Sequence, residues 1–194
     1  MKRLITLAVL VALVVGGEAT AQLDPYPDGL GLYFDSDATK YCLENAAGLV
    51  EMYLFLTRCS QPSGISGWEC HATYTIPPGD YEIGWTLPAG SLNVSSAPDF
   101  AVGLATPLPN APIMLLATLQ ILVFSTAAID FYLGPADNPS IPGLPVYAAG
   151  DDPGVLIPLH LISGSPSVPV AGLNNCFTVG AEQSSFGNVK ALYR

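Results

Sequence analysis

Apolar segments of strand length recur along the chain, and prolines and glycines separate them. Within several segments apolar and polar residues alternate, which is the two-residue period of a β-strand. Prolines recur roughly every ten residues from Pro62 to Pro169, and proline is excluded from the interior of a helix. The pattern therefore predicts about ten strands. These are Gly29–Asp35, Leu49–Cys59, Ser66–Ile76, Tyr81–Leu87, Phe100–Ala105, Ile113–Phe124, Ile129–Leu133, Gly143–Ala148, Val155–Ile162 and Cys176–Val179.

Strands at this spacing, with turn signals between them, are typical of sandwiches and barrels. We expect an all-β fold, a two-sheet sandwich or jelly-roll of about nine to ten strands. The third segment alternates most regularly, so Trp68 and Cys70 should face the core while Glu69 and His71 face solvent. We expect the second and third segments to be consecutive antiparallel strands.

The start of the chain has the features of a secretory signal peptide. Lys2 and Arg3 precede an apolar run that is too short to span a bilayer, and Ala19-Thr20-Ala21 offers the small residues that signal peptidase recognises. We expect cleavage after Ala21 and a protein secreted to the periplasm or the extracellular space. The chain then divides into a signal peptide at 1–21, a lead-in at 22–28, a β-sandwich domain at 29–180 and a C-terminal tail at 181–194.

Two interpretations of the tail stay open. Lys190 and Arg194 are basic residues at the end of an acidic chain, and Ser184–Tyr193 has apolar residues at helical spacing. The tail is either a short helix or frayed end that lies on its own domain, or a docking or sorting tag.

The charge balance narrows the class of partner. The chain contains 16 acidic and 6 basic residues, and its formal net charge is −10 at pH 7. Nucleic-acid phosphates and anionic membrane surfaces both attract Lys and Arg. We therefore expect no nucleic-acid partner and no stable membrane insertion after signal cleavage. A protein or a glycan is the expected partner.

Four cysteines in an exported chain predict two disulfide bonds. If the second and third predicted strands form a hairpin, Cys59 and Cys70 lie opposite each other within bridging reach. Cys42 then pairs with Cys176. A bond between Cys42 and Cys70 is the rival pairing.

Two tryptophans are candidates for stacking on a carbohydrate. Aromatic side chains offer large, rigid contact areas, and Trp68 and Trp85 lie in two predicted strands. Because Trp68 shares the core face with Cys70, its place in the core is the favoured interpretation, and Trp85 is the better exposed candidate.

Two acidic pairs are candidate calcium ligands. Asp35 and Asp37 follow the first strand, and Asp151 and Asp152 lie in a Gly-Asp-Asp-Pro-Gly loop. Calcium takes several oxygen ligands, but aspartate is also common in turns because its side chain bonds to the local backbone. We favour turn chemistry over a calcium site and expect no cofactor.

No catalytic centre is predicted. His71 and His160 are the only histidines, and no Gly-x-Ser-x-Gly nucleophile elbow accompanies them. Glycoside hydrolysis needs two facing carboxylates. Glu69, Glu82 and Asp99 are candidates, but acidic residues are common in this chain. We expect ordinary strand histidines and a protein that is not an enzyme.

The order of these segments resembles a cohesin-like β-sandwich of the carbohydrate-binding superfamily type. The resemblance covers roughly 29–180 and rests on the stretches GLGLYFD, LVEMYLFLTRC, SGISGWECHATYTI and IMLLATLQILVF with the AIDFYLGP that follows it. The chain departs from the cohesins of bacterial scaffolds in its four cysteines and single copy. It is similar also to secreted bacterial proteins that share its Ser66–Cys70, Asn138–Gly143 and Val189–Arg194 patterns. The resemblance implies the fold and export, and it implies no activity.

The sequence thus predicts a secreted, acidic, non-catalytic bacterial β-sandwich that binds a protein or builds part of the envelope or an extracellular structure. A carbohydrate-binding module is the alternative, and it requires an exposed row of Trp and Tyr on one sheet. A hydrolase is less favoured and requires a pocket with two converging titratable groups.

Overall fold

The computed structural model describes residues 25–176, and several predictions lie outside them. These are the signal peptide, residues 22–24 of the lead-in, the tail with its helix at Ser184–Tyr193, and all but the first residue of the strand expected at Cys176–Val179. Cys176 itself lies in a turn. Every regular element between residues 25 and 176 is a strand. That part of the chain accordingly contains no helix long and apolar enough to cross a membrane.

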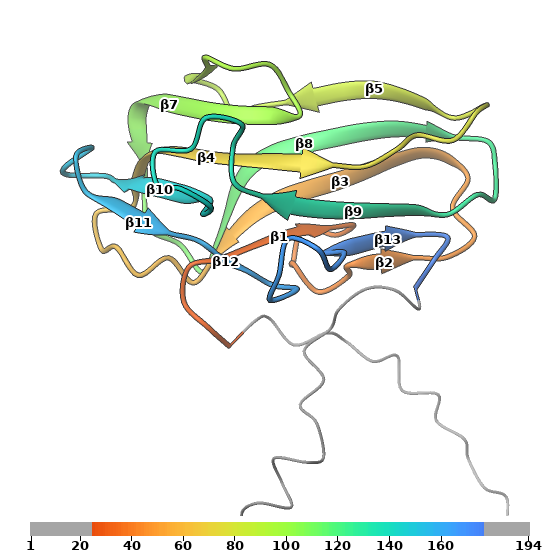
Figure 1. Ribbon diagram of the computed structural model, residues 1–194, viewed down its shortest axis with the longest axis horizontal. Coiled ribbons are helices and arrows are strands. Elements are labelled where there is room, and N and C mark those ends of the chain that lie inside the picture. The colour runs from red at the N-terminus through yellow and green to blue at the C-terminus, as the bar shows by residue number, and fades with distance from the viewer. Residues whose placement is uncertain (1–24, 177–194) are drawn as a thin grey trace, which may run out of the picture.

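Thirteen strands make up the described fold (Figure 1). They are β1 (Gly29–Tyr33), β2 (Cys42–Leu43), β3 (Gly48–Thr57), β4 (Ile65–Thr73), β5 (Tyr81–Thr86), β6 (Ser91–Asn93), β7 (Asp99–Leu108), β8 (Ile113–Val123), β9 (Ile129–Gly134), β10 (Val146–Ala149), β11 (Leu156–Pro158), β12 (His160–Leu161) and β13 (Ala171–Leu173).

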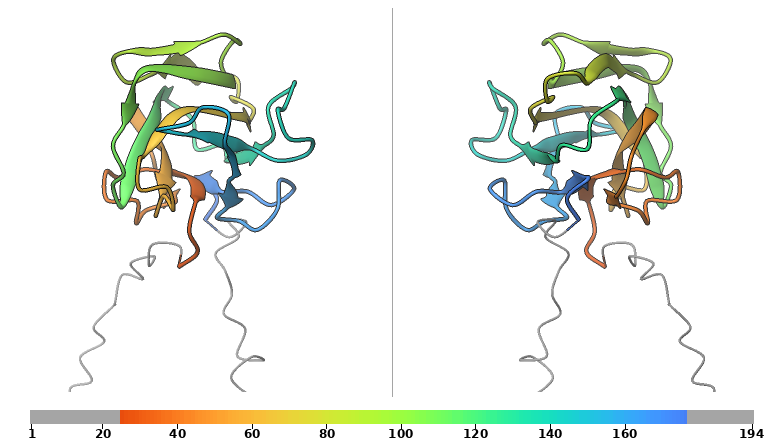
Figure 2. Two further views of the ribbon diagram at one scale, coloured as in Figure 1. Left: turned by 90° about the vertical axis from the view of Figure 1, so that its left-hand side faces the viewer. Right: turned by 90° about the vertical axis from the view of Figure 1, so that its right-hand side faces the viewer.

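The strands form two sheets packed into a sandwich, which confirms the predicted fold class (Figure 2). The five-stranded sheet has the order β12-β1-β3-β8-β5. The eight-stranded sheet has the order β11-β10-β4-β9-β13-β2, with β7 beside β4 and β6 beside β7. Burial of the apolar faces between the two sheets is the main source of stability for such a fold.

Alternate residues of the long strands build the core. In β8, Leu119, Ile121 and Val123 are buried, while Gln120 and Leu122 between them are half-buried on the outer face. This is the strand period that the sequence predicted. The largest fully buried side chains contributed by the opposite sheet are Phe100, Phe131 and Tyr147.

One predicted strand is divided in two, and three short strands were not predicted. The segment Val155–Ile162 is not one strand, because β11 ends at Pro158 in the eight-stranded sheet and β12 begins at His160 in the five-stranded sheet. Proline has no N–H to extend the ladder, so the chain leaves one sheet there and enters the other. The strands β2, β6 and β13 have two or three residues each, too few to show an alternating pattern.

The predicted hairpin between the second and third strands is wrong. β3 belongs to the five-stranded sheet and β4 to the eight-stranded sheet. The connecting segment, residues 58–64, begins with Arg58 at a φ of 53° and ends with Gly64 at a φ of 76°. Packed sheets lie about 10 Å apart, and this loop is long enough to cross between them instead of folding back within one sheet.

Candidate functional site

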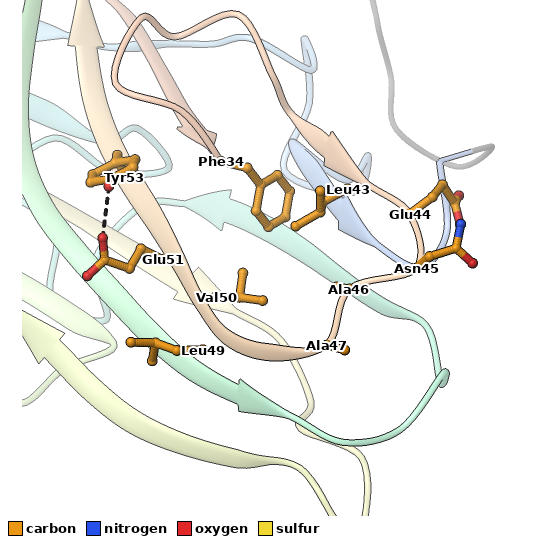
Figure 3. Close-up of a pocket in the computed structure, with 10 residues that line it drawn as sticks. All are labelled: Phe34, Leu43, Glu44, Asn45, Ala46, Ala47, Leu49, Val50, Glu51 and Tyr53. Atoms are coloured by element: carbon orange, nitrogen blue, oxygen red, sulfur yellow. Dashed lines mark hydrogen bonds between the residues drawn. The ribbon is translucent and has the colours of Figure 1, made fainter.

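An open pocket of about 480 Å³ lies beside the start of β3 in the five-stranded sheet (Figure 3). Its lining combines apolar side chains with two carboxylates. In Figure 3, Phe34 and Leu43 lie on one side of the β3 ribbon, and Glu51 and Tyr53 lie on the other. The lining residues are Phe34, Leu43, Glu44, Asn45, Ala46, Ala47, Leu49, Val50, Glu51 and Tyr53.

The pocket lies along an edge of β3 that has no neighbouring strand among the described residues. β8 pairs with β3 from Gly48 to Thr57, whereas β1 pairs only with Tyr53–Thr57. Among the described residues, Gly48–Met52 therefore has a strand on one side only. The backbone N–H and C=O groups of an unpaired edge are a template for another extended chain.

Glu51 is the centre of a hydrogen-bond network on the outer face of the sheet. Gln120 Nε2 donates to Glu51 Oε1 at 2.7 Å, and Tyr53 Oη donates to Glu51 Oε2 at 3.0 Å. The bonds from Gln120 and Tyr53 hold the pKa of the Glu51 carboxyl below its ordinary value. The bond to Glu51 raises the pKa of Tyr53. Glu51 is therefore an ionised acceptor at neutral pH, and both of its oxygens are oriented.

The rest of the pocket wall is also held in place. The Tyr53 ring stacks on Phe55 with centroids 5.8 Å apart and planes 14° apart, and Phe55 packs against Tyr33 with centroids 5.9 Å apart. At the opposite end, Glu44 Oε1 accepts a hydrogen bond from the Cys176 backbone N–H at 2.7 Å. A largely polar surface that carries two carboxylates beside smaller apolar areas suits cationic side chains with apolar stems.

Neither tryptophan forms the proposed carbohydrate-stacking surface. Trp68 is 3% exposed and packs on Phe100 in the core, as favoured from the sequence. Trp85 is the more exposed of the two but is half-buried. Its Nε1 donates to Tyr74 Oη at 2.8 Å, and its ring meets Phe100 edge-on. Trp85 pairs across β5 and β8 with the buried Leu119, which turns it toward the core.

The four aspartates considered as calcium ligands bond to nearby turns and loops. Asp35 accepts hydrogen bonds from the backbone N–H groups of Thr39 and Lys40, both at 2.9 Å, and from the Thr39 hydroxyl. In the second loop Asp152 accepts from the Gly154 N–H at 2.9 Å. The hydroxyls of Ser36 and Ser63 donate to the other two, Asp37 and Asp151. Asp35 and Asp152 thus bond to the backbone of their own turns, whereas Asp151 bonds to a serine of another loop. The described residues bring none of the four into a cluster of metal ligands.

One predicted disulfide is confirmed and the other is wrong. Cys42 and Cys176 are bonded, with their Cα atoms 5.4 Å apart. Cys59 and Cys70 are free and buried. The first follows β3 and the second lies in β4, so they come from opposite sheets and the hairpin that would pair them does not form. The Cys59 thiol instead contacts the Tyr147 hydroxyl at 3.7 Å.

The carboxylates considered for glycoside hydrolysis are divided between the two sheets. Glu82 lies on β5, whereas Glu69 and Asp99 lie on β4 and β7 of the other sheet. The expectation that Glu69 faces solvent is wrong, since it is 9% exposed. The loop after β9 covers it, and the Ser140 N–H and hydroxyl donate to its carboxylate at 2.6 and 2.9 Å. Of the two histidines, the structure places His160 in β12 and His71 on β4.

The pocket was not predicted from the sequence. The run Leu49, Glu51, Tyr53 has the period of a strand and places a carboxylate next to an aromatic ring on one face. This alternation is visible in the sequence. That β1 ends early and leaves the start of β3 without a neighbour depends on the whole sheet and not on this run.

No protein family model, curated protein or solved structure matches the chain.

Proposed function

We propose that the chain is a secreted, non-catalytic interaction module that binds an extended segment of a partner protein at the pocket beside β3. The observation that carries this proposal is the Gly48–Met52 edge, which borders the pocket and has a strand on one side only. An added strand would gain affinity from backbone hydrogen bonds, and its alternate side chains would provide specificity.

The lining of the pocket defines the chemistry of the partner. Phe34 and Leu43, both half-buried, offer apolar surface to one face of an added strand. Glu44 and Glu51 offer carboxylates to cationic groups. The partner segment is therefore extended, with apolar and basic side chains.

Export is supported by two features. The Cys42–Cys176 bond is of a kind that persists in oxidising compartments such as the periplasm and the extracellular space. The first 21 residues carry the signal-peptide pattern. The cohesin-like resemblance supports a binding role and names no partner.

Peptide binding tests the proposal directly. The probe is a fluorescent peptide of alternating valine and lysine, compared with one of alternating valine and glutamate, each titrated into the full secreted chain. We expect the lysine peptide to bind at least about tenfold more tightly, because the pocket carries two carboxylates. Amide hydrogen exchange should slow at Gly48–Met52 when it binds.

A steric block and its matched control complete the test. Ala47 is exposed and lines the pocket, so Ala47→Trp should weaken binding at least about tenfold. Ala89 is exposed in a turn outside the pocket, so Ala89→Trp should leave binding unchanged. Equal affinity for the two peptides, or tight binding to Ala47→Trp, would contradict the proposal.

A carbohydrate-binding role is the second candidate, and a different observation favours it. Tyr53 is a half-buried aromatic ring beside the oriented polar groups of Glu51 and Gln120, the combination that sugar rings and their hydroxyls require. Cello- and xylo-oligosaccharides are the probes. On this hypothesis they bind, Tyr53→Ala abolishes binding, and hydrogen exchange at Gly48–Met52 does not change.

A further inference from the structure

Three side chains from separate elements converge on the eight-stranded sheet, away from the pocket. His71 lies in β4, Asp99 begins β7, and Asp137 lies in the loop after β9. His71 Nδ1 is 2.9 Å from Asp137 Oδ1 and 3.5 Å from Asp99 Oδ1. One ligand atom from each of the three residues lies within 4.8 Å of the other two.

The backbone holds this arrangement in place. His71 and Asp99 are direct neighbours in the register of β4 and β7. The Asp137 backbone N–H donates to Asp99 Oδ1 at 2.9 Å, which fixes the loop to the start of β7. Farther along the same loop, Glu69 binds Ser140 through two hydrogen bonds. Figure 1 shows this loop, between β9 and β10, passing beside β4.

The cluster carries an excess of negative charge. Asp99 is only 9% exposed, and burial of a carboxylate is costly unless a positive charge or hydrogen bonds compensate it. Between residues 25 and 176 the chain has one lysine and one arginine, Lys40 and Arg58, and neither forms an ion pair with Asp99 or Asp137. A single imidazole faces both carboxylates, so the cluster suits a bound dication.

We propose that His71, Asp99 and Asp137 form a binding site for a divalent transition-metal ion of the Zn²⁺ type. Ligand atoms at about 2.0–2.1 Å from zinc in a tetrahedral arrangement lie about 3.4 Å from one another. The 3.5 Å separation is close to that value, and the 2.9 Å separation, a hydrogen bond between His71 and Asp137, widens by about 0.5 Å to admit the ion. An imidazole nitrogen suits zinc and related metals, whereas Ca²⁺ and Mg²⁺ prefer oxygen ligands.

The exposure of the cluster leaves room for a further ligand. The Asp137 side chain is 65% exposed, so a water molecule can complete the coordination from the solvent side. The metal ion joins β4 and β7 to the loop after β9. Its effect on the fold is to hold that loop against the sheet.

Metal titration of the full secreted chain, purified without a polyhistidine tag, tests the site. Co²⁺ binding is followed by its visible absorption, and Zn²⁺ is then added as a competitor. We expect one Co²⁺ per chain, displaced by Zn²⁺ and not by Ca²⁺. The melting temperature should rise with Zn²⁺, because a ligand that binds only the folded state stabilises it.

Matched variants locate the bound ion. His71→Ala and Asp137→Asn should each weaken Co²⁺ binding at least about tenfold and remove the Zn²⁺-dependent rise in melting temperature. His160→Gln and Asp37→Asn, which change the same residue types elsewhere, should bind Co²⁺ like the unaltered chain. The proposal is overturned if the unaltered chain shows no saturable Co²⁺ binding, if Ca²⁺ displaces the Co²⁺, or if His71→Ala binds Co²⁺ with unchanged affinity.

Discussion

Asp80 shows how one carboxylate stabilises a connection between strands. It is 6% exposed and immediately precedes β5. Its Oδ1 accepts the backbone N–H groups of Phe124 and Ser125, both at 2.8 Å, and its Oδ2 accepts the Ser125 hydroxyl at 2.8 Å. Burial by itself raises the pKa of Asp80, but these three hydrogen bonds outweigh it and hold the pKa below its ordinary value.

This depressed pKa predicts a pH-dependent contribution to stability. The contribution is present above the carboxyl pKa of the unfolded chain, about 3.9, and it is lost as the pH falls through the lower pKa of the folded state. Asp80→Asn should therefore lower the free energy of unfolding by about 1 kcal/mol or more at pH 7, and by less at pH 3. Urea unfolding at both pH values measures this. Asp37→Asn, at an exposed site, is the control, and an equal loss for Asp80→Asn at both pH values would contradict the argument.

Among the elements, β4 has the largest number of strand partners, since it pairs with β7, β9 and β10. The residue that leads into it, Gly64, has a φ of 76°. A Cβ atom there would lie 1.9 Å from the Leu108 carbonyl oxygen at the end of β7. The Gly64 carbonyl also accepts the Gly150 N–H at 2.9 Å, so the backbone cannot move away freely.

Gly64→Ala should consequently destabilise the sandwich. We expect a loss of roughly 2 kcal/mol or more in the free energy of unfolding, because both the positive φ and the close carbonyl oppose a side chain. Gly103→Ala in β7 is the matched control, since no atom lies within 4 Å of its Cβ position. Urea unfolding compares the two variants, and similar stabilities would show that the β4–β7 contact adapts to a methyl group.

At the scale of the whole molecule, the arrangement of the two sheets determines which cysteines form a disulfide bond. The Cys42–Cys176 bond joins residues 134 positions apart, so it constrains nearly the whole described chain. Cys59 and Cys70 remain buried thiols. Burial raises the pKa of Cys70, which suppresses the reactive thiolate.

Thiol titration checks this assignment. With Ellman's reagent, the native chain should show no reactive thiol, and the chain in guanidinium should show two. Prior reduction should raise the count in guanidinium to four, which serves as the control. Four thiols without reduction would contradict the Cys42–Cys176 bond, and none in guanidinium would restore the second predicted disulfide.

The sequence by itself determined the architecture and much of the local chemistry. Alternation along Ser66–Ile76 and the recurring prolines predicted strands and a sandwich, because strand geometry gives a period of two and proline is incompatible with helix interiors. The core position of Trp68 followed from the same alternation. The bonds of Asp35 and Asp152 to their turns followed from the reach of a short carboxylate to the nearby backbone. All of these are local properties, set by residues close together in the chain.

Only the tertiary structure decided which strands share a sheet and which distant residues meet. β3 and β4 are consecutive yet lie in different sheets, and this separated Cys59 from Cys70. β1 ends at Tyr33 while its neighbour continues, and this opened the pocket. The loop after β9 buried Glu69 and brought Asp137 to His71. Pairings between residues this far apart depend on how both sheets pack at once, and no short stretch of sequence contains that information.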